Sequence, residues 1–338
     1  MISSLSRDEL YYRQQLSHDQ IDDILAEKRA AEFPESKARH LGKLNAFLEV
    51  SSLLENEGIS FIPQKGPVLS YRLYGDPLYR TYNDLDFLID ADQIPGAVRL
   101  LIDNDFEFFS YTFPEKKCYR ELLFRHVNEL CLWSPSLDAG IELHWRLVNG
   151  RLSGHIKDEQ LIRENSMALV FHGREFKILN NDLELLYLVI HGALHGWKRL
   201  KWLLDVKVFL QKFEPDELRF TELVSQLSAG RPVAVCNELL KIFFPGTKLL
   251  PSTYKAPAGM VRFALQQINQ PDGEKGMAEF LGFLRNSWRA FPGMGYKIDL
   301  LKRNLFATDL ANASWMPCSA LAYYIVSPFQ KLIRGFRG

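Results

Sequence analysis

Asp84 and Asp86 are separated by a single residue, and the positions around them are apolar as far as Ile89. A strand alternates its side chains between two faces, so both carboxylates point to one side while Leu85 and Phe87 point into a core. Such a pair can share divalent cations, because hard cations such as Mg²⁺ prefer oxygen ligands and take the remaining ligands from substrate phosphates. The spacing therefore indicates metal-dependent phosphate chemistry.

Lys65 and Gly66 follow a strand-like run that ends at Gln64, and Pro67 comes directly after them. Glycine permits a tight turn, and proline is favoured in the first turn of a helix. A helix N-terminus attracts anions, so Lys65 and Gly66 are predicted to form a phosphate-binding corner. The alternative is an ordinary turn with a solvated lysine.

Arg80 precedes the aspartates and is expected to offset phosphate or pyrophosphate charge. It could equally be a surface residue that pairs with Asp76 or Asp84, which would stabilise the fold little.

A second strand-like run contains Glu142 and His144 on one face and Ile141 and Leu143 on the other. Glu142 on a strand beside the aspartates would complete a two-metal site, in which one ion activates the attacking oxygen and the other steadies the leaving group. Asp138 competes for this place but lies in a predicted turn. The alternative for Glu142 is a solvated sheet face.

His191 and His195 lie one helical turn apart, on a predicted single helix from 191 to 205. No glutamate follows His191 as in zinc peptidases, so that class of enzyme is disfavoured. The histidines are expected either to hydrogen-bond between sheet and helices or to touch a nucleotide or acceptor.

His126 and Glu129 fall on a predicted long strand from 122 to 133, where alternation places them on opposite faces. His126 is expected to help bind phosphate, whereas Glu129 is expected at the surface.

The motifs that carry this chemistry are Lys65-Gly66, Arg80-x-x-x-Asp84-x-Asp86, Glu142-x-His144-Trp145, His191-Gly-x-x-His195-x-Trp197 and Trp202-x-x-Asp205. Together they resemble a largely uncharacterised bacterial nucleotidyltransferase family of the DNA polymerase β-like superfamily. The resemblance implies transfer of a nucleoside monophosphate from an NTP to a hydroxyl or similar acceptor, with two Mg²⁺ ions. It further implies that Asp84 and Asp86 are metal ligands and Glu142 the third carboxylate.

This chain departs from the superfamily pattern at the turn that contains Gly66. In the superfamily a serine usually follows the glycine, whereas here Lys65 precedes it and Pro67 follows it. The main alternative function is a non-catalytic nucleotide-binding or scaffold protein that retains the fold. A phosphohydrolase that uses water as acceptor is a second alternative, for which a richer His/Asp ligand set would be expected.

The fold expected to position these residues is α+β, a small mixed sheet flanked by helices with a mostly helical C-terminal domain. The predicted parts are an N-terminal helical segment (1–58), an α/β core (59–150) and a helical domain (151–338). Predicted strands are 60–63, 84–89, 106–111, 122–133 and 141–145. Predicted helices include 67–74, 95–104, 181–205, 216–228, 232–244, 259–268, 276–288 and 319–326, and Ser17 and Gln20 have capping-box spacing.

The chain has 338 residues, 47% of them hydrophobic, which suits a folded protein of two or three domains. Its net charge of zero argues against a mainly electrostatic nucleic-acid binder. Four scattered cysteines indicate neither a zinc site nor a disulfide framework, and with no signal-peptide pattern a cytoplasmic location is expected. The apolar stretch 313–329 is short for a membrane span and is predicted as a buried helix; the basic tail after it could instead contact a membrane surface or partner.

Overall fold

The computed structural model describes residues 2, 5–26, 34–109, 111–148, 152, 158–270, 277–305 and 319–335. The chain forms two compact units, each assembled from three separate segments. The first unit contains Met1–Leu41, Lys65–Tyr82 and Leu152–Gly293, and the second contains Gly42–Gln64, Asn83–Arg151 and Met294–Gly338. The predicted boundaries at 58 and 150 divide the chain into consecutive stretches instead, and they stay a prediction.

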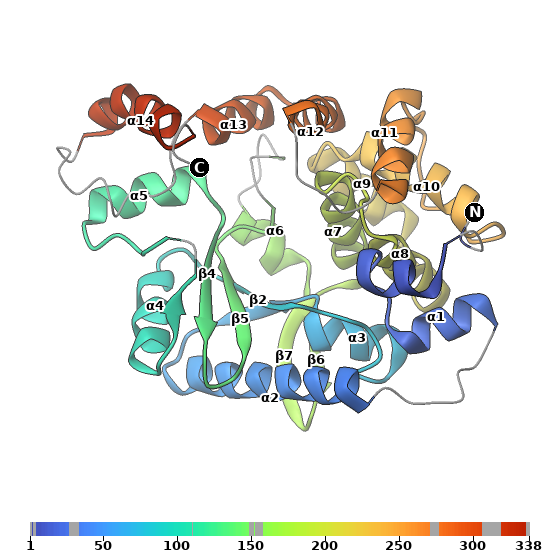
Figure 1. The fold of residues 1–338 in the computed structure, drawn as a ribbon, viewed down its shortest axis with the longest axis horizontal. Helices are drawn as coiled ribbons and strands as arrows, with labels where there is room; N and C mark the ends of the chain where they lie inside the picture. Colours follow the sequence, from blue (N-terminus) through green and yellow to red (C-terminus); the bar gives the residue numbers. More distant parts are fainter. Residues whose placement is uncertain are drawn as a thin grey trace. The chain divides into compact units, whose positions relative to one another are not determined.

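The second unit is built on a five-stranded sheet. Its strands are β1 (Phe61–Gln64), β2 (Asp84–Ile89), β3 (Glu107–Phe108), β4 (Glu129–Ser134) and β5 (Ala139–His144). Their order in the sheet is β1-β2-β5-β4-β3, and Figure 1 shows β4 and β5 side by side. Strands β2 and β5 run parallel, whereas all other neighbours are antiparallel. This mixed sheet among many helices confirms the predicted α+β class.

Strand β2 is held in place by its apolar side chains. Phe87 is fully buried, and its ring stacks on Phe47 of helix α2 (Pro34–Asn56) with 5.6 Å between centroids. Phe61 of β1 meets the same ring edge-on at 5.4 Å. Burying each such side chain contributes about 1.5–3 kcal/mol, which fixes the register and leaves Asp84 and Asp86 on the opposite face.

The remaining helices of the second unit are α4 (Ile94–Asp103), α5 (Lys117–His126), α13 (Met294–Leu305) and α14 (Ala320–Gly335). Helix α13 packs against α5 and α14. The predicted strand from 122 to 133 is wrong in its first half, which belongs to α5. The buried positions of that helix follow a period of 3.6 rather than 2, at Tyr119, Leu122, Leu123 and His126.

The first unit is mainly helical. Its helices are α1 (His18–Leu25), α3 (Gly66–Tyr74), α6 (Asp158–Glu164), α7 (Asn181–Leu194), α8 (Leu200–Lys212), α9 (Glu217–Gln226), α10 (Gly230–Phe243), α11 (Ala258–Asn269) and α12 (Met277–Ala290), with a short π-helix, η2, at Glu9–Arg13. The predicted capping box is confirmed, because Ser17 accepts from the Gln20 backbone and the Gln20 side chain accepts from that of Ser17.

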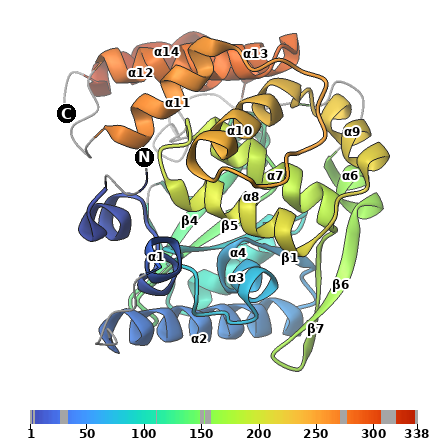
Figure 2. The same cartoon turned by 90° about the vertical axis from the view of Figure 1, so that its right-hand side faces the viewer.

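Two features of this unit were not predicted. The first is the antiparallel hairpin of β6 (Ser166–Phe171) and β7 (Arg174–Leu179), which Figure 2 shows as a long ribbon. His172 and Gly173 close it with φ values of 50° and 73°. Such a turn suits the twist of a two-residue hairpin.

The second is a break in the predicted helix from 191 to 205, which ends as α7 at Leu194 and resumes as α8. Gly196 and Trp197 adopt φ values of 63° and 58°, and the Trp197 backbone N–H donates to the Gly192 carbonyl at 2.8 Å. The buried indole then lies against Gly192, where an added Cβ would be 2.4 Å from the ring. The break between α7 and α8 therefore coincides with close packing of tryptophan on glycine.

Cys131 and Cys236 are free thiols, but Cys118 is disulfide-bonded, so the expectation drawn from scattered cysteines is wrong for this residue. Spacing along the chain does not reveal which cysteines meet in a fold. Within the residues that the structure describes, no helix combines the length and apolar character needed to cross a membrane.

Candidate functional site

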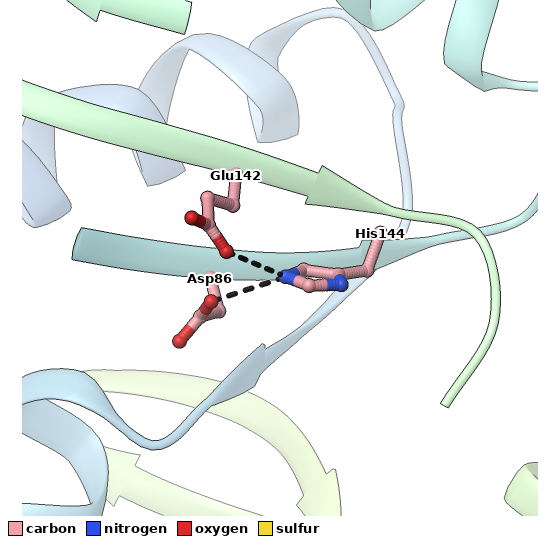
Figure 3. Close-up of side chains that lie close together, drawn as sticks. All are labelled: Asp86, Glu142 and His144. Carbon is pink, nitrogen blue, oxygen red and sulfur yellow. Dashed lines mark hydrogen bonds and ion pairs between the residues drawn. The ribbon is translucent and has the colours of Figure 1, made fainter. Parts of the chain in front are cut away.

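Asp86 and Glu142 meet because their strands are parallel neighbours in register. The Cα atoms of the two residues are direct partners across β2 and β5, and so are those of Leu88 and His144. Residues paired in this way project to the same face, so one face carries both carboxylates and the imidazole (Figure 3). The prediction that Glu142 joins the aspartates from a neighbouring strand is consistent with this register.

His144 lies between the two carboxylates. Its Nε2 atom is 3.1 Å from Oδ1 of Asp86 and 3.3 Å from Oε2 of Glu142. One ligand atom from each of the three residues falls within 4.8 Å of the others. Asp86 and His144 are buried, whereas Glu142 keeps 25% of its side chain exposed. The group is therefore compact and open at Glu142.

Burial and charge oppose each other in this group. Burial by itself lowers the pKa of His144, but hydrogen bonds to Asp86 and Glu142 and their negative charge raise it to about 10. Burial raises the pKa of Glu142 to about 7, against the lowering effect of its hydrogen bond with His144. His144 is consequently cationic at neutral pH and balances the neighbouring carboxylates.

Glu129 and Cys131 are neighbours of this group that sequence reasoning missed. Glu129 pairs with His144 across β4 and β5, and its Oε2 atom is 3.6 Å from Nδ1 of His144. Cys131 pairs with Glu142 in the same ladder and donates to it at 3.8 Å. The turn joins Ser134 to Ala139, and the register that it sets places both residues beside the group; a turn predicted two residues longer would pair Cys131 with His144 instead.

Asp84 and Asp138 occupy different places. Asp84 begins β2, is half-buried and shares the face of Asp86, although it is not part of the three-residue group found among the described residues. Its charge still acts on the group, since it contributes to the raised pKa of Glu142. Asp138 is exposed in the turn between β4 and β5, as predicted, with φ of 48°.

His126 is the last residue of α5, not a strand residue. Its Nε2 atom lies 3.2 Å from the hydroxyl of Tyr324 on α14. Burial lowers its pKa to about 4, with further lowering by Lys302. His126 is thus neutral at physiological pH, and its predicted role in phosphate binding stays a prediction.

Lys65 and Gly66 form the predicted turn from strand to helix. Both have positive φ values, 51° and 50°, and Pro67 occupies the first turn of α3. A positive φ is unusual for lysine, so the local fold must hold this conformation. The Lys65 ammonium lies 6.0 Å from the ring centre of Tyr187 on α7.

Arg80 is buried and forms a two-pronged ion pair with Asp205 of α8. Its Nε and Nη2 atoms each donate to one carboxylate oxygen at 2.8 Å. The alternative of a surface pair with Asp76 or Asp84 is therefore wrong. Its predicted contact with phosphate stays a prediction, while the ion pair gives it a structural role in linking its loop to α8.

His191 and His195 face each other at the end of α7, with ring centres 4.6 Å apart. Trp202 of α8 lies 5.3 Å from the first ring and 5.2 Å from the second. Burial and the nearby Lys65 lower the pKa of His191, which keeps the imidazole neutral. These three rings form a partly exposed aromatic cluster near Lys65. The cluster connects the end of α7 with α8 across the break between them.

Comparison with known proteins adds a family. A family model described as "Uncharacterised nucleotidyltransferase" matches residues 10–245. A presumed nucleotidyltransferase from Thermotoga maritima is 16% identical, with 48% of this chain and 92% of that chain covered and a TM-score of 0.31. An antigenic nucleotidyltransferase-like protein from Paracoccidioides brasiliensis is 16% identical, with 62% and 94% covered and the same TM-score of 0.31. No curated protein matches the chain.

Proposed function

The chain belongs to the uncharacterised nucleotidyltransferase family, and on this premise we propose that it transfers a nucleoside monophosphate from an NTP to an acceptor. An acceptor oxygen forms a bond to the α-phosphorus, and the bond from that phosphorus to the oxygen of pyrophosphate breaks. Such chemistry depends mainly on positioning and electrostatics, which a rigid sheet face can provide.

The residues proposed to hold divalent cations, with two Mg²⁺ ions expected, are Asp84, Asp86 and Glu142. They fit such ions because Asp86 and Glu142 offer hard oxygen donors from register-paired positions and Asp84 shares their face. Bound Mg²⁺ would supply Lewis-acid activation of the acceptor oxygen and charge stabilisation of the leaving pyrophosphate. His144 keeps the carboxylates of Asp86 and Glu142 oriented, and Glu129 lies at its second ring nitrogen.

The triphosphate is proposed to bind at the Lys65-Gly66 turn. The chain passes directly into Lys65 from Gln64, which is the register partner of Asp86. Backbone N–H groups at the start of α3 and the Lys65 ammonium offer positive charge to phosphate oxygens. Arg80, His126, His191 and His195 are further candidates for contacts with the nucleotide or acceptor.

The observation that carries this proposal is the pairing of Asp86 with Glu142 on parallel strands, in a chain matched by a nucleotidyltransferase family model. The test is pyrophosphate release from each of the four NTPs with Mg²⁺ and a panel of hydroxyl acceptors. Asp86→Asn should lower turnover at least a hundredfold. Asp90→Asn, the same change at an exposed position directly after β2, should leave it unchanged.

Two results would overturn the proposal. Tight NTP binding without turnover across the acceptor panel, together with equal binding by Asp86→Asn, would favour a non-catalytic nucleotide-binding protein. Release of a nucleoside monophosphate or inorganic phosphate in the absence of any acceptor would indicate a phosphohydrolase.

A further inference from the structure

Helices α13 and α14 of the second unit expose apolar rather than polar residues. Among the described side chains of α13, the exposed ones are Met294, Ile298, Leu301 and Leu305. Those of α14 are Leu321 and Ile325, with 70% and 57% exposed. A soluble surface helix normally shows the opposite pattern, with its polar residues outward.

The four residues of α13 form one continuous stripe. Their spacing of alternately four and three positions keeps them on one side of a helix. Lys297 and Lys302 lie roughly 70° to either side of the centre of this stripe, at 3.6 residues per turn. Both lysines are half-buried, with alkyl stems that can cover apolar surface while the ammonium groups reach outward.

The charge of these helices is one-sided. They contain five basic residues and one acidic residue, in a chain with 41 of each. Among the described side chains of these helices, the acidic residue, Asp299, is only 8% exposed, and the charged residues beside the stripe are the half-buried Lys297 and Lys302, which are positive. An apolar stripe flanked by lysines is the pattern of a helix that lies in the interface of a membrane, attracted by anionic lipids.

From these observations we propose that α13 and α14 dock on an anionic lipid surface, which the apolar stripe enters while Lys297 and Lys302 contact lipid phosphates. The two helices lie next to each other in both views, and α13 packs on α5 (Figures 1 and 2). A second copy of the chain is a poorer occupant of this surface, because its identical helices would bring like charges together.

The test is flotation of the full chain with vesicles of phosphatidylcholine and phosphatidylglycerol in equal amounts. We expect binding to these vesicles, weak binding to pure phosphatidylcholine, and loss of binding at high salt. The double variant Ile298→Gln/Leu301→Gln should bind at least tenfold more weakly. Lys297→Ala and Lys302→Ala should each weaken binding roughly fivefold.

Leu218→Gln is the matched control, because Leu218 is 80% exposed on α9 among charged neighbours and should have no effect. Since the changed residues are at the surface, circular dichroism should show all variants folded. Equal binding by the stripe variant, or no binding by the wild type, would overturn the proposal. The proposal would also be overturned if light scattering showed the wild type as a dimer and the stripe variant as a monomer. That result would identify a second copy of the chain as the occupant of this surface.

Discussion

Asp86, Glu142 and His144 show how a buried charge is tolerated when one partner lies on its own strand and another on the next strand. An imidazolium between two carboxylates recovers through hydrogen bonds what it loses in hydration. The group therefore favours the protonated state of His144, and its stability must depend on pH.

The expected pH dependence follows from the direction of the pKa shift of His144. The pKa is raised above that of an ordinary histidine, to about 10, so the stabilisation is full below the unfolded pKa and is lost as pH rises toward 10. Between pH 7 and 10, the wild type should lose stability relative to His144→Gln by up to about 1.4 kcal/mol per pH unit. Urea unfolding at several pH values, with a chelator present, measures this difference.

His172→Gln is the control for that experiment, because His172 is exposed in the β6–β7 turn. A wild type and a His144→Gln variant with parallel pH profiles would show that the imidazole is not held by these carboxylates. The compared pH range starts at 7 because the pKa of Glu142 is also raised, to about 7. Below that pH, titration of Glu142 adds its own change in stability.

At the scale of elements, the buried pair of Arg80 and Asp205 joins the loop before β2 to α8. Asp205→Asn leaves a buried guanidinium without its counter-charge and should cost about 3–5 kcal/mol of unfolding free energy. Lys241→Ala removes an exposed pair with Glu238 and should change stability by less than about 1 kcal/mol. Denaturant unfolding of both variants makes the comparison, and equal effects would refute the structural role of Arg80.

The end of α7 provides a second test at this scale. The same change, glycine to alanine, should lower the stability of the protein at one position and raise it at another. Gly192→Ala would place its Cβ 2.4 Å from the Trp197 ring and should destabilise by about 1–3 kcal/mol. Gly42→Ala on exposed α2 meets nothing within 4 Å and should stabilise by about 0.5–1 kcal/mol. Thermal unfolding distinguishes the two, and a tolerated Gly192→Ala would show that the break between α7 and α8 does not depend on this contact.

At the scale of the whole molecule, both units are discontinuous in sequence. The second unit is completed by the segment from Met294 onward, which lies beyond the residues matched by the family model. His126 of α5 contacts this segment, with its ring 5.5 Å from that of Tyr323. The stability of the sheet unit should therefore depend on the C-terminal helices.

Tyr323→Ala tests this dependence. Tyr323 is 1% exposed, so its loss should destabilise by about 3–5 kcal/mol, as for other large aromatic residues in a core. Ile325→Ala, on the exposed side of the same helix, should have little effect in the absence of lipid. Limited proteolysis together with thermal unfolding would reveal a loosened second unit, and equal behaviour of the two variants would contradict its completion by α14.

The sequence by itself determined the elements whose signals are local. Alternating apolar and acidic residues identified β2, Lys65-Gly66-Pro67 identified the start of α3, and Ser17 with Gln20 identified the cap of α1. Each of these depends on side chains within a few residues of one another. The resemblance to an uncharacterised nucleotidyltransferase family was likewise readable from short motifs and is confirmed by the family match, whereas its bacterial origin and the DNA polymerase β-like superfamily stay predictions.

Only the tertiary structure decided which residues meet. The ion pair of Arg80 with Asp205 joins segments 125 residues apart. The pairing of His144 with Glu129 depends on the register of the β4–β5 hairpin, and the break before α8 depends on how the Trp197 indole packs on Gly192. The same is true of α5, where burial on one face selected a helix over the predicted strand. Local patterns restrict the backbone conformation of a segment. Which side chains contact one another is decided by packing and charge across the fold, and spacing along the chain does not encode these contacts.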